Sequence, residues 1–188
     1  LQQSTDVDFL KYEGPTDPTI TGSIGNIFTY KNFRLNVFVT YSGGNKVRLD
    51  PMFRSSYSDL DATPKDFKIR WVLPGDEKVT DIPVMASSFE RNQYANLSIA
   101  YNSYNYSTAR IASGAFVRLK EVSLSYDFPK EWLKSTPISS VGLKIQGTNL
   151  ALLYADSKLN GQDPEFFRSG GVSAPVPKQF TLTLKVGF

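Results

Sequence analysis

The sequence predicts an all-β fold, namely the C-terminal strands of an antiparallel transmembrane β-barrel. Apolar and polar residues alternate with a period of two in about five stretches, and a strand with this period has one apolar and one polar face. The connections between the stretches are alternately short and long, like the periplasmic turns and extracellular loops of outer-membrane barrels. Because a bacterial membrane barrel needs about eight strands or more, we expect these strands to be part of a larger barrel.

Residues 19–31 and 33–43 are expected to form a hairpin with a short turn at Lys31 and Asn32. The alternation places Asn26 on the apolar face and Ile27 on the polar face of the first strand, the reverse of what their side chains favour. Phe38 is the one exception on the polar face of the second strand. Aromatic residues near the strand ends fit the interfacial girdle of a membrane barrel. A soluble hairpin explains this segment equally well.

Residues 44–114 are expected to form a long loop that lies outside the membrane, and a loop of this length is usually functional or disordered. Its aromatic content argues against disorder, and Pro64 followed by residues 65–71 predicts a short helix. Aromatic rings among Asn and Ser suit adaptable recognition surfaces, although packing inside the loop's own fold is the expected role of most of these rings. The candidate recognition residues are Trp71, Tyr94, Tyr101, Tyr104 and Tyr106.

Residues 115–128 and 140–154 are the next two expected strands. The first half of 115–128 is out of phase with the second half, which indicates either a β-bulge near Lys120 and Glu121 or a half that projects beyond the lipid. The alternation in the strand 140–154 also changes phase near its end. Beyond that point, Leu150, Leu152 and Tyr154 are expected to lie on the same face of the strand.

A second long loop, residues 155–177, leads to the final strand, residues 178–188. Small, hydroxylic or charged residues separate the apolar residues of that strand, and roughly 9 to 11 tilted residues are enough to cross a bilayer. A terminal aromatic residue on such a strand resembles the signal that the outer-membrane insertion machinery reads. The predicted assembly signal consists of Phe180, Leu182, Leu184, Val186 and Phe188.

The polar faces of the expected strands are predicted to line a wet lumen, while the apolar faces meet lipid. Alternation of this kind also occurs in soluble sandwiches, so it does not decide between a membrane barrel and a soluble sandwich. The predicted lumen-facing residues are Arg34, Asn36, Lys144, Gln146 and Lys185.

The composition excludes several kinds of chemistry. The 188 residues contain no Cys and no His, which removes disulfides, thiolate nucleophiles, the usual zinc ligands and every His-based triad. We therefore expect no enzyme activity, no metal and no cofactor. The acid pairs Asp6/Asp8 and Asp59/Asp61 do not continue into an EF-hand loop and are interpreted as solvated loop acids. The net charge of +3 is spread along the chain, which gives no support for nucleic-acid binding.

Several segments together carry a resemblance to a known family. They include TGSIGNIFTYKNFRLNVFVTYSGGN from Thr21, SGAFVRLKEVSLSYDFP from Ser113, GLKIQGTNLALLY from Gly142, GQDPEF from Gly161 and PVPKQFTLTLKVGF at the end. In this order they resemble the C-terminal part of SusC/RagA-type TonB-dependent transporters.

The resemblance implies the last strands of a roughly 22-stranded plugged barrel in the Gram-negative outer membrane. It also implies import of oligosaccharides or peptides, with contacts to outer-membrane lipid, to the rest of the barrel and the plug, and to a SusD-like lipoprotein lid. TonB would be contacted through an N-terminal part that this sequence lacks, so energy coupling is not expected to reside in these residues.

Two other hypotheses remain open at this point. One is a soluble β-sandwich that binds carbohydrate through Trp71 and the tyrosine-rich part of the long loop. The other is a SusC-like scaffold subunit of an outer-membrane assembly or secretion complex, in which scaffolding replaces transport.

Overall fold

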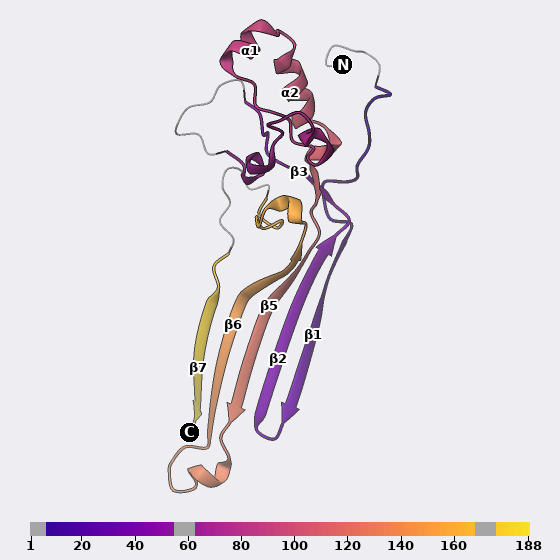
Figure 1. The fold of residues 1–188 in the computed structure, drawn as a ribbon. Coiled ribbons are helices and arrows are strands. Elements are labelled where there is room, and N and C mark those ends of the chain that lie inside the picture. Colours follow the sequence, from indigo (N-terminus) through magenta and orange to yellow (C-terminus); the bar gives the residue numbers. More distant parts are fainter. Residues whose placement is uncertain (1–6, 55–62, 168–175) are drawn as a thin grey trace. The chain divides into compact units, whose positions relative to one another are not determined.

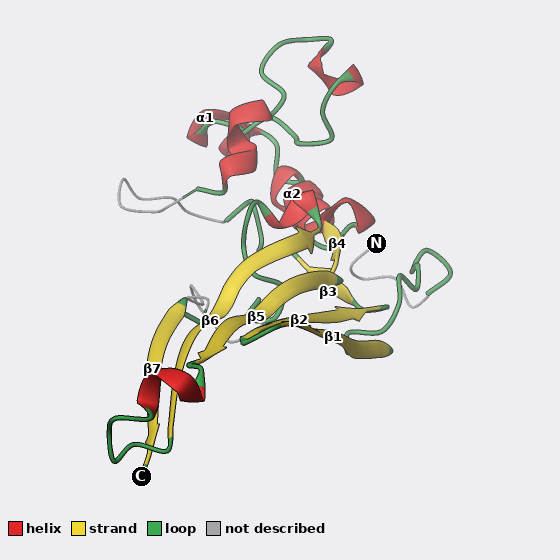
Figure 2. Cartoon of the chain, turned by 90° about the horizontal axis from the view of Figure 1, so that it is seen from below, coloured by secondary structure: helices red, strands yellow, loops and turns green. Residues whose placement is uncertain are grey.

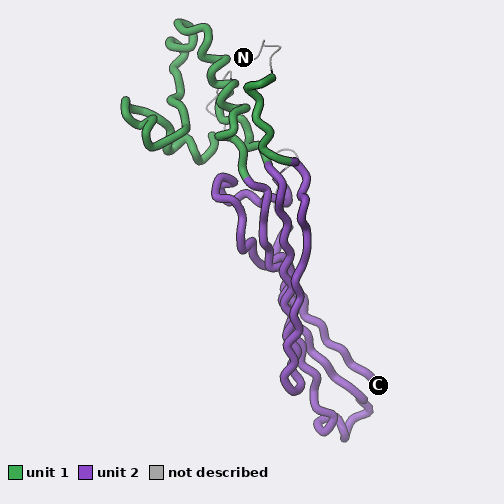
Figure 3. Tube along the Cα trace, turned by 90° about the vertical axis from the view of Figure 1, so that its right-hand side faces the viewer, with its two compact units in different colours: residues 1–14, 47–112 green, residues 15–46, 113–188 purple. Residues whose placement is uncertain are grey.

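A computed structural model describes residues 7–54, 63–167 and 176–188. The chain divides into two compact units (Figure 3). The first unit comprises residues 1–14 and 47–112 and is called the loop unit below. The second comprises residues 15–46 and 113–188 and is called the sheet unit.

The sheet unit is built on one antiparallel sheet of five strands (Figure 1). The prediction of a five-stranded antiparallel sheet is confirmed, and the sheet is open, so the barrel is not closed in this chain. Each strand end lies within one residue of the end expected from the alternation. In spatial order the strands are β1 (Ile20–Tyr30), β2 (Phe33–Gly43), β5 (Phe116–Asp127), β6 (Ser140–Ala155) and β7 (Gln179–Gly187).

The hairpin β1–β2 pairs without interruption from Tyr30 opposite Phe33 to Ile20 opposite Gly43. Lys31 adopts a left-handed backbone conformation with φ of 51°, which helps so short a connection to reverse the chain. The regular register keeps Asn26 opposite Val37 and Ile27 opposite Asn36. Asn26 therefore lies on the apolar face and Ile27 on the polar face, as the sequence pattern indicates.

A β-bulge in β5 explains why the two halves of this strand are out of phase. Phe38 of β2 pairs with Glu121, but the next residue, Val39, pairs with Leu119, so Lys120 has no partner in the ladder. A bulge adds one residue to one strand and thereby reverses the faces beyond it. Leu119 thus returns to the apolar face, and the predicted bulge near Lys120 and Glu121 is confirmed.

The strand β6 is irregular in two places. In the first place, Thr148 of β6 pairs with Glu121 of β5, but the next paired residue of β6 is Ala151, opposite Leu119. Asn149, which lies between them, has a φ of 53°. A second shift pairs Tyr154 with Val117 but Leu152 with Arg118. The expectation that Leu152 and Tyr154 align is therefore wrong, because the second shift places them on opposite faces.

The loop unit corrects the all-β prediction, because its described residues are mainly helical and irregular (Figure 2). Helix α1 begins with a capping box, in which the Ser87 hydroxyl accepts from the Glu90 amide and the Glu90 carboxylate accepts from the Ser87 amide. The helix expected over 65–71 is a short 3-10 helix. The elements are β3 (Lys46–Arg48), η1 (Lys65–Ile69), η2 (Asp76–Lys78), α1 (Ser88–Gln93), α2 (Leu97–Asn105), η3 (Thr108–Arg110) and β4 (Ile111–Ser113), where β3 pairs with β4.

Two further 3-10 helices lie in the connections of the sheet unit. They are η4 (Lys130–Leu133), in the short connection after β5, and η5 (Ser157–Leu159), which follows β6. The side chain of Asp156 caps η5 by accepting from the Lys158 amide at 2.9 Å. Leu159 of this turn is 2% exposed, so the beginning of the second loop is packed rather than extended.

Candidate functional site

The apolar face of the sheet forms continuous rows across the strands, because directly paired residues of neighbouring strands share a face. One row runs from Phe28 through Leu35, Leu124 and Ile145 to Leu182. Leu182 is 69% exposed, and most of the large apolar residues of this face are exposed as well. In the part of the chain that the structure describes, the only other sheet is the two-stranded pair β3–β4. An apolar surface of this extent needs an apolar solvent or partner.

The polar face carries four of the five predicted lumen-facing residues in two neighbouring rows. Arg34 and Lys144 flank Ser125, and Asn36 and Gln146 flank Ser123. The Asn36 amide donates to the Glu121 carboxylate at 3.3 Å. Lys185 stands two residues beyond Thr183, which pairs with Lys144, so it lies on the same face. The structure brings all five residues together on one face, and their exposure to a lumen remains a prediction.

Aromatic rings collect at the end of the sheet where the short connections lie. The rings of Phe33 and Tyr126 are 4.6 Å apart, those of Tyr126 and Phe128 are 5.0 Å apart, and those of Phe128 and Trp132 are 6.1 Å apart. Tyr30 pairs with Phe33 and is 71% exposed. Aromatic rings at one level of a strand set are typical of a membrane–water interface.

An ion-pair cluster that no sequence pattern predicts holds the second loop to the polar face. The guanidinium of Arg118 donates to both carboxylate oxygens of Asp163, with one contact of 2.6 Å, and its Nε lies 3.2 Å from the Glu165 carboxylate. The side chains of Arg118 and Asp163 are 5% and 7% exposed. Such a pair is favourable only when the geometry is good, and removal of one partner leaves a buried charge. No local sequence pattern links two residues so far apart.

Two of the five candidate recognition residues, Tyr101 and Tyr104, belong to the core of the loop unit. Their rings lie 4.3 and 5.6 Å from the ring of Phe53, and the Tyr101 hydroxyl donates to the Val84 carbonyl at 2.7 Å. Met52, Phe53, Phe67 and Ile82 form the buried centre of this core. Packing, which was the expected role of most of the rings, therefore describes these two.

The other three candidates lie nearer the surface of the loop unit. Tyr94 and Tyr106 are 58% and 64% exposed, and the guanidinium of Arg48 sits 5.5 Å from the centre of the Tyr106 ring. Trp71 is half-buried, and its indole nitrogen donates to the Leu73 carbonyl. The structure therefore does not gather the five residues into one patch, and recognition by Tyr94 and Tyr106 stays a prediction.

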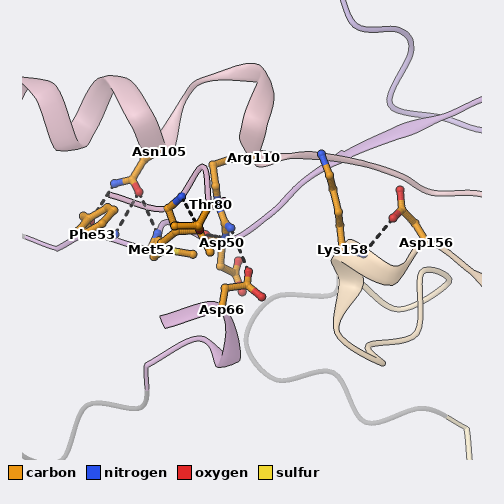
Figure 4. Close-up of polar contacts among 10 residues, drawn as sticks. Asp50, Met52, Phe53, Asp66, Thr80, Asn105, Arg110, Asp156 and Lys158 are labelled. Atoms are coloured by element: carbon orange, nitrogen blue, oxygen red, sulfur yellow. Dashed lines mark hydrogen bonds and ion pairs between the residues drawn. The ribbon is translucent and has the colours of Figure 1, made fainter. Parts of the chain in front are cut away.

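Polar contacts fix the loop unit from within (Figure 4). The buried side chain of Asn105 accepts from the amides of Met52 and Phe53 at 2.9 and 3.1 Å and donates to the Phe53 carbonyl at 2.8 Å. Buried Arg110 donates to the Asp50 carbonyl at 2.9 Å and pairs with Asp66 at 3.3 Å. These contacts join segments of the loop unit that lie far apart in the sequence.

Local hydrogen bonds also shift the acidity of the loop unit. Amides of Leu73 and Val72 donate to Asp76 and lower the pKa of its carboxyl. Burial raises the pKa of the Tyr104 hydroxyl, against the opposing effect of Arg110. Neither side chain lies next to a nucleophile. Both pKa shifts are explained by the hydrogen bonds and burial that come with the folded loop unit.

A concave pocket of about 610 Å³ lies on the loop unit beside α1 and α2. Its lining includes Arg54, Arg91, Asn92 and Asn102, with Phe53 and Ile99 as apolar members.

Within the described residues, no group of three or more Asp, Glu, His or Cys side chains is placed to hold a metal ion. Asp6 and the pair Asp59/Asp61 lie outside the described residues. None of the described helices is long and apolar enough to span a membrane.

Comparisons with known proteins agree with this geometry. The chain is 28% identical over 155 residues to the TonB-dependent receptor P3 of Formosa agariphila, covering 82% of this chain and 14% of that receptor. It is 24% identical over 183 residues to the TonB-dependent receptor P26 of the same organism, covering 91% of this chain and 17% of that receptor. No family model matches the sequence. The chain thus spans only a small part of the curated relatives it matches.

Solved structures show the same fold. A chain of the RagAB peptide importer in its open-open state matches with a TM-score of 0.66 and 20% identity, covering 95% of this chain and 18% of that one. A chain of the RagAB peptide transporter also matches with a TM-score of 0.66, at 22% identity, covering 94% of this chain and 18% of that one.

The comparisons show that the chain is similar to part of TonB-dependent receptors, a class of transporters rather than enzymes. The resemblance to the SusC/RagA type is confirmed, since the chain is similar to these receptors in sequence and shares its fold with part of a RagAB chain. This homology implies the outer membrane.

Proposed function

We propose that the chain forms part of the barrel wall and the outer loops of a SusC/RagA-type TonB-dependent transporter in a Gram-negative outer membrane. The observation that carries the proposal is the open sheet, whose apolar face is exposed and whose edge strands are β1 and β7. An edge strand presents unpaired backbone groups, which cannot remain unpaired inside a bilayer. Further strands of the same receptor satisfy both edges and close the barrel.

The transported solute is proposed to be a peptide or an oligosaccharide, captured with the help of a SusD-like lipoprotein. The similar solved structures are those of the RagAB peptide importer or transporter. The word peptide in these names supports a peptide as the solute, and the two-part name RagAB supports a second protein component. The two long connections leave the sheet at the end opposite the short ones, so loops with exposed Tyr94 and Tyr106 face outward if the short connections are periplasmic.

A soluble sandwich fits the structure less well. A sandwich covers the apolar face of one sheet with the apolar face of another. In the described residues the only other sheet is the two-stranded pair β3–β4. The exposed rows of the apolar face therefore favour lipid as their solvent.

The functional test uses the full-length receptor in its native membrane, together with its lipoprotein. The double variant Tyr94→Ala/Tyr106→Ala removes the two exposed rings but leaves Tyr101 and Tyr104 in the core. We expect normal insertion, with weaker lipoprotein association or slower uptake of peptides or oligosaccharides. Phe89→Ala, at a residue that is 75% exposed in the same unit, is the matched control. Unchanged association and uptake in the double variant would contradict recognition by these rings.

The apolar face of β7, together with Phe188 directly after the strand, is proposed to act in assembly of the barrel. Phe188 is 90% exposed, and Phe180, Leu182 and Leu184 precede it on the same apolar pattern. Burial of one ring in lipid stabilises by only ~1.5 to 3 kcal/mol. Deletion of Phe188 is therefore expected to reduce the surface level of the receptor far more than its stability. A normal surface level would show that the residue acts by burial alone.

A further inference from the structure

The connection between β5 and β6, residues 128–139, is much longer than the other short connection of the sheet. The hairpin β1–β2 reverses over Lys31 and Asn32 alone, whereas the connection of β5 and β6 contains the 3-10 helix η4 (Figure 1). The start of this helix is fixed, because the Trp132 amide donates to the Pro129 carbonyl at 3.1 Å. Two antiparallel strands can be joined without such an element, so the helix needs another explanation.

The helix η4 brings its tryptophan to the apolar side of the sheet. The ring of Trp132 lies 6.1 Å from that of Phe128, which lies 5.0 Å from the ring of Tyr126. Tyr126 pairs with Phe33 in a row of the apolar face. Trp132 is nevertheless 68% exposed. At a membrane–water interface, such a ring lies among the upper acyl chains while its indole nitrogen reaches polar groups.

Cationic side chains accompany these rings in both short connections. They are Lys31, Lys130 and Lys134, and all three are exposed. The Asp127 amide donates to the Asn32 carbonyl at 3.0 Å, which holds the turn of Lys31 beside the start of the longer connection. The ammonium of Lys31 lies 5.5 Å from the centre of the Tyr30 ring, and Tyr30 belongs to the apolar face. Among the described residues, none of the three lysines forms an ion pair.

The acidic residues nearby do not cancel this charge. Glu131 is the one acid of η4 and offsets only one of the three lysines. Asp127 pairs with Gly142 and lies on the polar face, away from the rings. The apolar side of this end of the sheet is therefore cationic. Lysine stems can lie along apolar surface while their ammonium groups reach phosphate, which is how basic residues beside aromatic rings hold anionic headgroups.

We infer that residues 128–139 and the turn at Lys31 form a lipid anchor that binds anionic phospholipids of the periplasmic leaflet. In this anchor Trp132 inserts among the acyl chains, and Lys31, Lys130 and Lys134 contact the phosphate groups. Charge complementarity selects the lipid class: a zwitterionic headgroup brings its own ammonium, which weakens the attraction to lysine. The inference rests on the proposed function, because the short connections reach this leaflet only in an inserted barrel.

The test measures which phospholipid contacts Trp132 in the full-length receptor, reconstituted into phosphatidylcholine vesicles. An equal fraction of either phosphatidylcholine or phosphatidylglycerol carries bromine on the upper acyl chain, where it quenches the fluorescence of a tryptophan that it touches. Subtraction of the signal of the Trp132→Phe receptor isolates the emission of Trp132. We expect quenching by both brominated lipids, with about fivefold tighter contact for phosphatidylglycerol, since one lysine near an anionic surface contributes about this factor.

Charge removal checks the role of the lysines. Lys31→Gln/Lys130→Gln/Lys134→Gln is expected to lower the preference for phosphatidylglycerol to about one, while brominated phosphatidylcholine still quenches Trp132. The matched control is a triple variant that removes the same charge from exposed positions of the loop unit and should leave the preference unchanged, namely Lys65→Gln/Lys68→Gln/Lys78→Gln. If the first variant does not insert, ~1 M NaCl, which shortens the Debye length to ~3 Å, should lower the preference of the unaltered receptor.

Two outcomes overturn the selection of anionic lipid: equal contact of Trp132 with the two lipids, or an unchanged preference both without the three lysines and at high salt. An inserted receptor in which neither brominated lipid quenches Trp132 overturns the whole anchor. Flotation of the vesicles measures insertion separately. A receptor that does not float with the vesicles would overturn the proposed function, whereas a floating receptor without quenching overturns only the anchor.

Discussion

The two units of this chain differ in one respect: the loop unit has a buried aromatic core, whereas the five-stranded sheet leaves most of its large apolar residues exposed. In the loop unit, Met52 is 1% exposed and Phe53 and Phe67 are each 6% exposed, around a core fixed by ring contacts and by Asn105. In the sheet unit, Phe180 is 76% exposed and Leu182 is 69% exposed, although β7 pairs with β6 without interruption. Water favours burial of such residues, so the exposed apolar face of the sheet supports the proposed lipid-facing barrel wall.

The comparison also shows what each unit needs from its surroundings. The loop unit packs its helices onto its own core, and buried Arg110 has its partners within the unit. The sheet unit lacks cover for the apolar face and partners for both edges in the described residues. In the proposed barrel, lipid covers the apolar face and further strands pair with β1 and β7.

The largest expected effect concerns the charged anchor of the sheet unit. Asp163→Ala leaves Arg118 buried with only Glu165 as a partner, and loss of one member of a buried pair costs about 3–5 kcal/mol. We expect hydrogen exchange of residues 156–167 in the full-length receptor to accelerate accordingly. Glu165→Ala, at a side chain that is 41% exposed, is the control and should have a much smaller effect. Equal exchange rates in both variants would mean that the anchor does not hold the loop.

A comparable loss is expected in the core of the loop unit. Phe53→Ala removes the ring that contacts Phe67, Tyr101 and Tyr104, and a buried Phe→Ala change typically costs about 3–5 kcal/mol. Hydrogen exchange of α2 should report the loss, while the barrel stays inserted. Phe89→Ala removes a ring that is 75% exposed and should leave exchange nearly unchanged. A loss of insertion in Phe53→Ala would show that the units do not fold independently.

Charge on the apolar face should be the next largest effect. Leu182→Arg is expected to cost roughly 2 to 4 kcal/mol if Leu182 lies near the bilayer centre, and Leu184→Arg less, because Leu184 lies in the row of Tyr30, Phe33 and Tyr126. Thr181→Arg, on the polar face, should insert normally. Folding of the purified receptor into lipid vesicles measures all three variants. An equal cost for Leu182→Arg and Thr181→Arg would contradict the assignment of faces.

The smallest expected effect is the response of the loop unit to alkaline pH. Burial raises the pKa of Tyr104, so the unfolded chain loses this proton at lower pH than the folded chain. The resulting stability is fully present below the ordinary pKa of tyrosine, ~10, and is lost as pH rises through the raised value. Exchange of α2 measured between pH ~9 and ~11 should accelerate beyond the intrinsic rate. Tyr104→Phe should remove this additional dependence, and its persistence in that variant would assign it to another group.

The same comparison explains how much the sequence could reveal. Alternation located the strands because a sheet face repeats every second residue, and even the bulge at Lys120 was visible as a change of phase. Helix α2 was missed because Asn, Ser and Tyr are weak helix formers and its turns pack on Phe53, a contact across the chain. Helix α1 did carry a readable signal, the capping box at Ser87 and Glu90. The pair Arg118–Asp163 had none, since its partners meet only through the fold.

The most direct test of the central claim is the solvent on each face of β7. Nitroxide labels at Leu182→Cys and Thr181→Cys, each as the single cysteine of the full-length receptor in lipid vesicles, sit next to each other on opposite faces. Collision rates with oxygen, which concentrates in lipid, and with a water-soluble nickel complex identify the solvent by electron paramagnetic resonance. A lipid-facing apolar face gives high oxygen and low nickel accessibility at residue 182, and low oxygen accessibility at residue 181. High nickel accessibility at residue 182 would contradict a lipid-facing sheet.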